Sequence, residues 1–295
     1  MKKYNVSKEF GFWSKFKPPM NKLILPVAQL ITNQMYKCLK RKREITFEKV
    51  KTTNFSAFLI KSKREENSST CLIYFHGGAF IYNASNYHYL SACKYVENLG
   101  CDLLMVNYSL SPKHRHPEQI NQCESALIYA SENYSNLLIG GDSAGGFLAI
   151  KTALKACNIK IKVGAVMLIY PVVDNKMQTA SMKEFYDTPM WNSRCNKKMW
   201  RWYYGGENLE ESLLDINLPS SFPPTYVETA QFDCLNNEGL IFAENLKKAG
   251  CKVVVNQTKN TMHGFDAVDC PTTQKAFLER IEFLKNIQKI EKTDL

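Results

Sequence analysis

A serine between glycines carries the strongest chemical signal in this chain of 295 residues. Residues 140–146 read Gly-Gly-Asp-Ser-Ala-Gly-Gly, so Ser143 stands in a G-x-S-x-G pattern. An apolar run at 137–139 precedes the serine, and a helical pattern at 144–156 follows it. A sharp strand-to-helix turn lifts such a serine hydroxyl above a sheet, and glycines permit the close backbone contacts of that turn. The pattern predicts a nucleophilic Ser143; a glycine-rich turn that only packs a helix on a sheet is the alternative.

His263 is the expected base for this serine. It follows the last apolar strand pattern, at 253–255, and precedes a helical pattern at 271–290. The loop after the last strand is where the chain order Ser, Asp, His places a catalytic histidine. Three others of the five histidines lie in helical or loop contexts without this signature: His88, His114 and His116.

The acid that orients the base is expected between the serine and the histidine. Asp233 follows the strand pattern at 226–229, at the carboxyl end of a strand, where sites of α/β proteins form. Asp174 follows the apolar run 163–169 in the same way, so chain order alone does not choose between them. We favour Asp233 because Asp174 opens a segment that has the pattern of an insertion.

Residues 76–80, His-Gly-Gly-Ala-Phe, suit the binding of an oxyanion. They come directly after the apolar run 71–75. Acyl transfer develops negative charge on a carbonyl oxygen, which preorganised N–H groups stabilise, and glycines leave their N–H groups accessible. We interpret His76 as a buried histidine that holds the shape of this loop, and not as a base.

Strand and helix patterns alternate from residue 55 onward, and this alternation positions the loops. Strands are expected at 55–60, 71–75, 103–108, 137–139, 163–169, 226–229 and 253–255. Helices are expected at 117–134, 144–156, 238–248 and 271–290. Such alternation implies parallel βαβ units with helices on both faces of the sheet. Two segments break the rhythm: 1–44, which predicts two helical pieces, and about 175–219, which is helical in pattern and rich in Trp and Met.

Charge and cysteine usage narrow the class of protein. The net charge of +10 comes from scattered lysines, and the one basic cluster, at 37–43, lacks interleaved aromatics, so we expect no nucleic-acid partner. The ten cysteines form no C-x-x-C pair and no zinc-site spacing, which favours reduced thiols in a cytoplasm and no metal. The apolar run 23–31 is too short to span a bilayer, and the N-terminus lacks the apolar stretch of a signal peptide, so no membrane anchoring is expected.

The motifs taken together resemble the hormone-sensitive-lipase-like branch of the α/β-hydrolases. They are the H-G-G loop, the G-D-S-A-G-G elbow, Y-x-L-x-P at 108–112, D-x-L-x-x-E-G at 233–239 and H-G-F at 263–265. They occur in the order of that family, and the resemblance extends over about residues 55–290.

This resemblance implies an α/β-hydrolase fold, with a mostly parallel central sheet, helices on both faces and a helical cap. Residues 1–44 would be N-terminal cap helices, and 45–295 the catalytic domain with a cap insertion at about 175–219. It further implies a carboxylesterase for small-molecule esters with short acyl groups, without a cofactor. The implied triad is Ser143, Asp233 and His263, and the implied oxyanion donors are Gly77, Gly78 and Ala144.

The chain departs from the usual family pattern in ways that bear on stability and substrate preference. Ala79 replaces the third glycine of the loop, and Phe80 stands where Trp is common. Other positions lose a usual ion pair or replace common residues: Ser109, Lys113, Cys234, Asn236 and Asn237. We expect Phe80 and Trp202 to contact the substrate and to narrow the acyl slot.

Two other functions remain open on the sequence. An amidase, an arylformamidase or a small peptidase uses the same triad, and sequence does not distinguish ester from amide cleavage. A non-catalytic binding protein is the second alternative, since the plant gibberellin receptors share the fold and have lost the histidine. The presence of His263 in its Gly-Phe context counts against it. The oligomeric state is open, with a dimer among the options.

Overall fold

The computed structural model describes residues 4–18, 20–21, 27, 29, 44–64, 68–206 and 211–293. Its centre is an eight-stranded sheet in the order β1-β2-β4-β3-β5-β6-β7-β8. The pairs β1–β2 and β2–β4 are antiparallel, and every further pair in this order is parallel. The strands are β1 (Ile45–Lys51), β2 (Ser56–Ser62), β3 (Thr70–Phe75), β4 (Asp102–Val106), β5 (Asn136–Asp142), β6 (Ala165–Ile169), β7 (Thr225–Phe232) and β8 (Val253–Met262).

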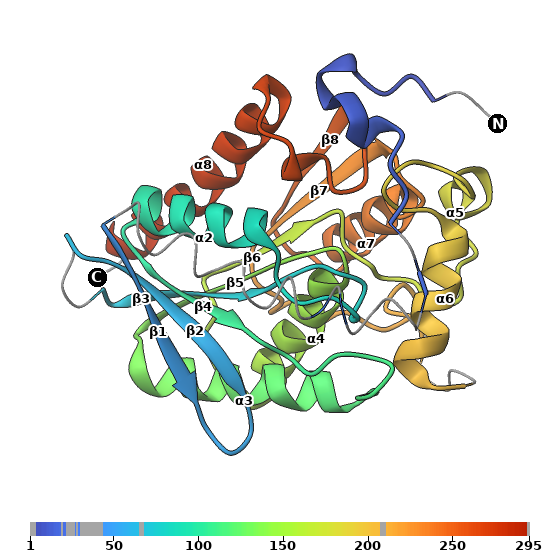
Figure 1. Ribbon diagram of the computed structural model, residues 1–295. Coiled ribbons are helices and arrows are strands. Elements are labelled where there is room, and N and C mark those ends of the chain that lie inside the picture. Colours follow the sequence, from blue (N-terminus) through green and yellow to red (C-terminus); the bar gives the residue numbers. More distant parts are fainter. Residues whose placement is uncertain are drawn as a thin grey trace.

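Helices cover both faces of this sheet (Figure 1). α2 (Asn86–Leu99) and α8 (Pro271–Thr293) lie on one face. α3 (Glu118–Asn133), α4 (Ala144–Ile159) and α7 (Asn236–Lys248) lie on the other. The expected fold, a mostly parallel sheet between two layers of helices, is confirmed.

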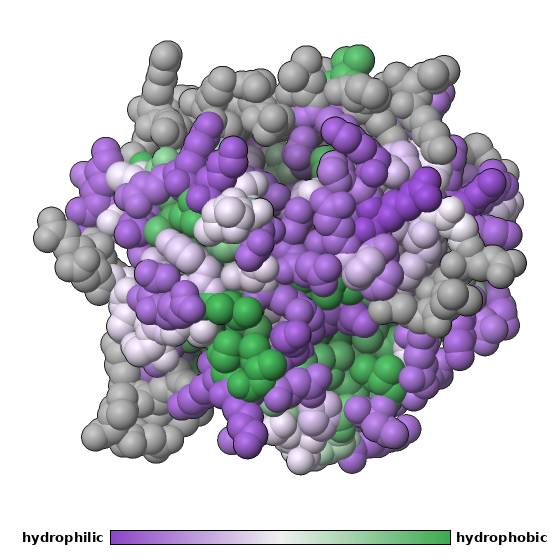
Figure 2. All heavy atoms as spheres, turned by 90° about the horizontal axis from the view of Figure 1, so that it is seen from below, coloured by the Kyte–Doolittle hydropathy of each residue, from purple (hydrophilic) through white to green (hydrophobic). Residues whose placement is uncertain are grey.

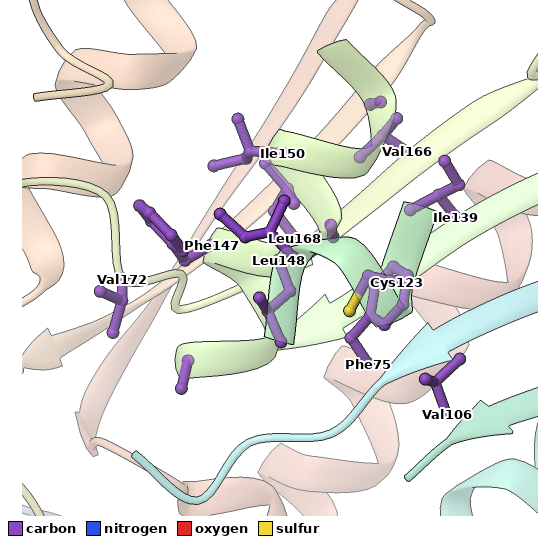
Figure 3. Packing of buried hydrophobic residues seen from close by; sticks show 14 of the residues in the cluster. Phe75, Val106, Cys123, Ile139, Phe147, Leu148, Ile150, Val166, Leu168 and Val172 are labelled. Atoms are coloured by element: carbon purple, nitrogen blue, oxygen red, sulfur yellow. The ribbon is translucent and has the colours of Figure 1, made fainter. Parts of the chain in front are cut away.

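The central strands are buried on both faces, which explains why they appear in the sequence as continuous apolar runs. β4 and β6 are buried along their whole length. On the α4 side, Phe147, Leu148 and Ile150 pack toward Val166 and Leu168 of β6 (Figure 3). Each such side chain contributes about 1.5–3 kcal/mol of burial free energy, so this layer fixes the helix that begins directly after Ser143.

The sequence patterns did not predict two elements of the fold, the strand β1 and the helix α2. β1 alternates apolar with charged residues at the edge of the sheet, so it forms no continuous apolar run. The other is α2, which ends at Leu99 and is capped by Gly100 in a left-handed conformation with φ +60°. β8 also extends well beyond the expected 253–255, and its last residue, Met262, directly precedes His263.

The expected insertion lies between β6 and β7 and contains α5 (Ala180–Glu184) and α6 (Ser193–Tyr204). In Figure 1 both helices lie to one side of the sheet. Of the two helical pieces expected in 1–44, the described part holds the 3-10 helix η1 (Lys8–Ser14), and most of the remainder, with the basic cluster at 37–43, lies outside the described residues. The backbone N–H of Met190 donates to the carbonyl of Phe16 at 2.7 Å, so the N-terminal segment contacts the insertion.

Figure 2 shows hydrophilic residues over most of one face, with smaller hydrophobic patches between them. Within the described ranges, no helix combines the length and the apolar character that crossing a bilayer requires. In the same ranges, no group of His, Cys, Asp or Glu side chains could hold a metal ion, and the nine cysteines are free thiols.

Candidate active site

The turn between β5 and α4 gives Ser143 an unusual backbone conformation, with φ +54° and ψ −120°. Non-glycine residues rarely adopt positive φ, and such strain is typical of functional turns. Neighbouring backbone comes very close here: a Cβ on Gly145 would lie 1.9 Å from the carbonyl oxygen of Phe75. The N–H of Ser143 donates to the carbonyl of Ile169 at 2.9 Å, which anchors the turn to β6. The glycines of the motif are therefore required for this turn.

Ser143, His263 and Asp233 form one hydrogen-bonded chain. Nε2 of His263 lies 2.9 Å from Oγ of Ser143, and Nδ1 lies 2.6 Å from Oδ2 of Asp233. Asp233 is fully buried, whereas 6% of Ser143 and 8% of His263 are exposed. A carboxylate only accepts hydrogen bonds, so Nδ1 carries the proton and Nε2 is free to accept the serine proton. The structure thus brings the three predicted residues together in an arrangement that can activate a hydroxyl.

The competing carboxylate, Asp174, has a different set of partners. It accepts hydrogen bonds from the backbone N–H groups of Lys176 and Gln178, at 3.0 and 3.1 Å. It also accepts one from the hydroxyl of Ser212, at 2.7 Å. Asp174 therefore joins the beginning and the end of the insertion, and the carboxylate beside His263 is that of Asp233.

One predicted oxyanion donor needs correction. The N–H of Gly77 donates to Oδ1 of Asp142 at 2.9 Å, so it is occupied by a buried carboxylate and cannot face an oxyanion. Within the described part of the chain, the N–H groups of Gly78 and Ala79 have no hydrogen-bond acceptor. Ala144 is the first residue of α4, and the N–H of a first helical residue has no partner inside its helix. The free donors near the elbow are therefore those of Gly78, Ala79 and Ala144.

Asp142 holds this loop against the elbow. Besides the Gly77 N–H, its carboxylate accepts hydrogen bonds from the Tyr74 hydroxyl at 3.0 Å and from Nε2 of His88 at 3.2 Å. Nδ1 of His88 accepts the N–H of Ser85, so its Nε2 carries the proton that faces Asp142. Burial alone would raise the pKa of Asp142, but His88 and the Gly77 N–H lower it to about 2. Asp142 is thus an ionised, fully paired anchor next to Ser143.

His76 has contacts that suit a structural role. Its Nδ1 lies 2.7 Å from the carbonyl oxygen of Gly77, and its ring stacks on Tyr108 with centroids 4.4 Å apart. The Tyr108 hydroxyl donates to the His76 carbonyl at 2.7 Å. Burial, together with the neighbouring His88, lowers the pKa of His76 from 6.5 to about 4. The ring is therefore neutral at pH 7 and stabilises the loop in that form.

This lowered pKa predicts a loss of stability in mild acid. The folded state disfavours protonated His76, so its contribution is complete above pH 6.5 and is lost as the pH falls toward 4. We expect His76 to account for about 3 kcal/mol of the fall in unfolding free energy over that interval. Urea unfolding at pH 7.0, 5.5 and 4.5 measures it, with His76→Asn as the comparison, because an amide donates the same hydrogen bond without titrating. An equal fall in both proteins would contradict the assignment.

The two aromatic residues expected to contact substrate have different surroundings: Phe80 packs against α6 from the loop after β3, and Trp202 is part of α6. Phe80 is fully buried and stacks on Tyr203 with centroids 4.1 Å apart; its ring also contacts Trp200 and Phe147. The ammonium group of Lys198 lies 5.1 Å from the ring centroid of Trp202. Trp202 lines a surface pocket together with basic side chains, among them Lys198 and Arg201. Phe80 thus fastens α6 to the oxyanion loop, and the contact of either ring with substrate stays a prediction.

Two residues beside His263 had no individual signal in the sequence. The ring of Tyr170, directly after β6, lies 4.6 Å from the imidazole centroid, and the ring of Trp191 lies 6.1 Å from it. Trp191 is fixed by a hydrogen bond from its indole N–H to Asn196 at 3.2 Å. The Trp-rich composition marked the whole segment at about 175–219 as unusual, but only the fold shows that Trp191 is the tryptophan beside His263.

Comparison with known proteins agrees with this architecture. A family description of the α/β-hydrolase fold matches residues 72–267. A protein of Acanthamoeba polyphaga mimivirus that is named as an α/β hydrolase is 28% identical over 239 residues, 73% of this chain and 66% of its own length. Esterase LipI of Mycobacterium tuberculosis is 25% identical, over 68% of this chain and 67% of its own length. This chain thus spans about two thirds of these curated relatives.

A solved structure extends the comparison of the fold to nearly the whole chain. The thermostable esterase from Pseudomonas putida has a TM-score of 0.83 and 23% identity, covering 97% of this chain and 98% of its own. Together with the family match and the order of the motifs, the comparisons identify this chain as a member of the α/β-hydrolase family, in its hormone-sensitive-lipase-like branch.

Proposed function

We propose that this protein is a serine hydrolase of the cytoplasm that cleaves small carboxylic esters with short acyl groups. The observation that supports this most strongly is the hydrogen-bonded chain from Asp233 through His263 to Ser143, with Ser143 raised on a strained turn. The esterase names among the relatives support the ester class. Ester cleavage by such a chain proceeds in two acyl-transfer steps.

In the first step, Nε2 of His263 takes the proton of Ser143 as Oγ attacks the ester carbonyl carbon. The carbonyl oxygen becomes an oxyanion, which the N–H groups of Gly78, Ala79 and Ala144 stabilise. The N-terminal end of α4 adds the positive end of its dipole at the same place. Ala79 adopts φ +58° here, a left-handed conformation that glycine adopts without steric cost, which explains why glycine is usual at this position.

In the second half of this step, protonated His263 gives its proton to the alkoxide oxygen as the bond from carbon to that oxygen breaks. The alcohol leaves, and the acyl group remains on Ser143. Water then repeats the sequence: His263 accepts its proton, the hydroxide attacks the acyl carbon, and Oγ leaves with that proton. Asp233 keeps the imidazole in the required tautomer and stabilises its positive charge throughout.

We propose that the N-terminal segment and the insertion at about 175–219 form the cap over this site. The contact of Met190 with Phe16 supports it, as does the position of Trp191 beside His263. His263 protonates the leaving alcohol, and Trp191 of the proposed cap lies beside His263. A cap made of these segments would therefore enclose the side of the site from which the alcohol leaves.

Matched p-nitrophenyl esters and p-nitroanilides of the same acids test the proposed reaction class. We expect turnover of the acetyl and butyryl esters, with kcat/KM for the anilides lower by several decades. Anilide turnover equal to that of the esters would favour the amidase alternative. Binding of the ester by the protein without any turnover would favour the non-catalytic alternative.

Acyl-chain length gives a second test of this proposal. Each methylene that the pocket buries contributes about 0.8 kcal/mol, and methylenes beyond its depth contribute nothing. We therefore expect kcat/KM to rise from acetyl to butyryl or hexanoyl and then to fall, without a jump when the substrate forms micelles. A maximum at dodecanoyl or longer would contradict the short-acyl proposal.

A further inference from the structure

A network of hydrogen bonds and ion pairs lies beside the loop of the histidine, and no step of the mechanism uses it. Beside the nucleophile, Asp142 accepts the hydroxyl of Tyr87 at 3.1 Å. The hydroxyl of Tyr170, directly after β6, donates to Oδ1 of Asp266. Asp266 follows the histidine closely in sequence, in the 3-10 helix η3 (Phe265–Ala267). Tyr170 is thus tied to the segment that carries His263.

A buried arginine is the centre of this network. Arg280 of α8 is 2% exposed and donates through one terminal N–H to Oδ2 of Asp266 at 2.9 Å. Its Nε donates to Oε2 of Glu228 at 2.9 Å, and its other terminal N–H donates to Oε1 of the same carboxylate. A planar guanidinium that bridges two carboxylates fixes their relative position in a way that a flexible ammonium group does not. Asp266 is therefore fixed to β7 and α8.

Tyr170 transmits this constraint to the imidazole of His263. Its ring lies 4.6 Å from the imidazole centroid, at an interplanar angle of 58°. Its backbone N–H donates to the carbonyl of Glu228 at 2.7 Å, so both ends of the tyrosine are held. Burial and the nearby Asp266 raise the pKa of Tyr170 well above 10, which keeps the hydroxyl a donor. The ring cannot move away from the imidazole without breaking a buried hydrogen bond.

From this geometry, and resting on the proposed function, we infer that Tyr170 and Arg280 are positioning residues that hold His263 in line with Ser143 through the carboxylate of Asp266. Asp233 sets the tautomer of the imidazole, and Tyr170 sets the place of its ring. Displacement of a reacting group by about 1 Å lowers rates by about a hundredfold, so a loosened ring affects turnover more than substrate binding.

Tyr170→Phe tests this role, with Tyr226→Phe as the matched control. Both tyrosines donate a hydroxyl hydrogen bond to a buried carboxylate of the same network, since Tyr226 donates to Glu228 at 3.1 Å. Only Tyr170 also contacts the imidazole. For Tyr170→Phe we expect kcat to fall about 10- to 100-fold with KM within about twofold of wild type. For Tyr226→Phe we expect kcat within about twofold, although both variants lose one buried hydrogen bond.

Two further readouts make the test decisive. Urea unfolding compares the stability of both variants, and the rate of covalent labelling by a fluorophosphonate reports on nucleophile activation without a choice of ester. Slower labelling by Tyr170→Phe alone, at matched stability, supports the positioning role. Equal kcat in the two variants, or a rise in KM that accounts for the loss, would overturn it. A wild-type protein that neither turns over esters nor is labelled would instead overturn the proposed function, and the positioning role with it.

Discussion

Replacement of Ser143 by alanine is expected to lower kcat for p-nitrophenyl butyrate by about five to six decades, to the level left by binding and the oxyanion donors. Removing the attacking oxygen leaves the hydrogen-bonded pair of Asp233 and His263 without its partner but keeps the backbone of the turn. Steady-state kinetics at saturating substrate measure the loss.

Ser212→Ala is the matched control for this change. Ser212 is buried like Ser143, with 1% exposed against 6%, and its hydroxyl also donates to a side chain, in this case that of Asp174. We expect its kcat to stay within about threefold of wild type, because Asp174 keeps two backbone donors. If Ser143→Ala retained a tenth of the activity, the elbow would not supply the nucleophile.

The second large effect is expected for Asp233→Asn, with kcat lower by about three to four decades. The amide has nearly the shape of the carboxylate, but its NH₂ group can donate a hydrogen bond to Nδ1 of His263. That bond favours the tautomer in which Nδ1 carries no proton and Nε2 carries one. The imidazole then presents its N–H to Ser143 and cannot accept the serine proton. The structure is expected to remain folded, so circular dichroism and urea unfolding accompany the kinetic measurement.

Asp174→Asn separates the two candidate acids. Asp174 accepts from two backbone N–H groups and one hydroxyl at the ends of the insertion, and an amide oxygen can retain part of these bonds. Its effect on kcat is expected to stay below about tenfold, and its main effect is expected on stability. A larger loss in Asp174→Asn than in Asp233→Asn would contradict the assignment of the acid.

The three residues of the proposed triad could be predicted because each follows a strand of a parallel sheet. The carboxyl ends of such strands lie at one edge, so residues after β5, β7 and β8 come together although they are far apart in sequence. The glycine-rich motif indicated the position of Ser143, and chain order together with a position after a strand restricted the acid to Asp174 and Asp233. The sequence already favoured Asp233, because Asp174 opens the inserted segment, and the partners of Asp174 at both ends of that segment agree with this choice.

The donors of the oxyanion loop show where such prediction stops. The motif indicates that glycine N–H groups are accessible, but it does not indicate which of them another buried group occupies. The N–H of Gly77 is taken by Asp142, a residue of the elbow motif 65 positions later in the chain. Tyr170 and Trp191 were missed for a related reason: aromatic residues near a strand end or in an insertion are common in cores, and their contact with His263 arises only from tertiary packing.

The central claim, that Ser143 is an activated nucleophile, is tested most directly by covalent labelling. Wild-type protein is treated with a fluorophosphonate, digested and examined by mass spectrometry, with Ser143→Ala and Ser212→Ala treated in parallel. The account predicts a single phosphonylated peptide that contains Ser143, the same peptide in Ser212→Ala, and no labelling in Ser143→Ala. Labelling that persists in Ser143→Ala, or that maps to another serine in the wild type, would contradict it.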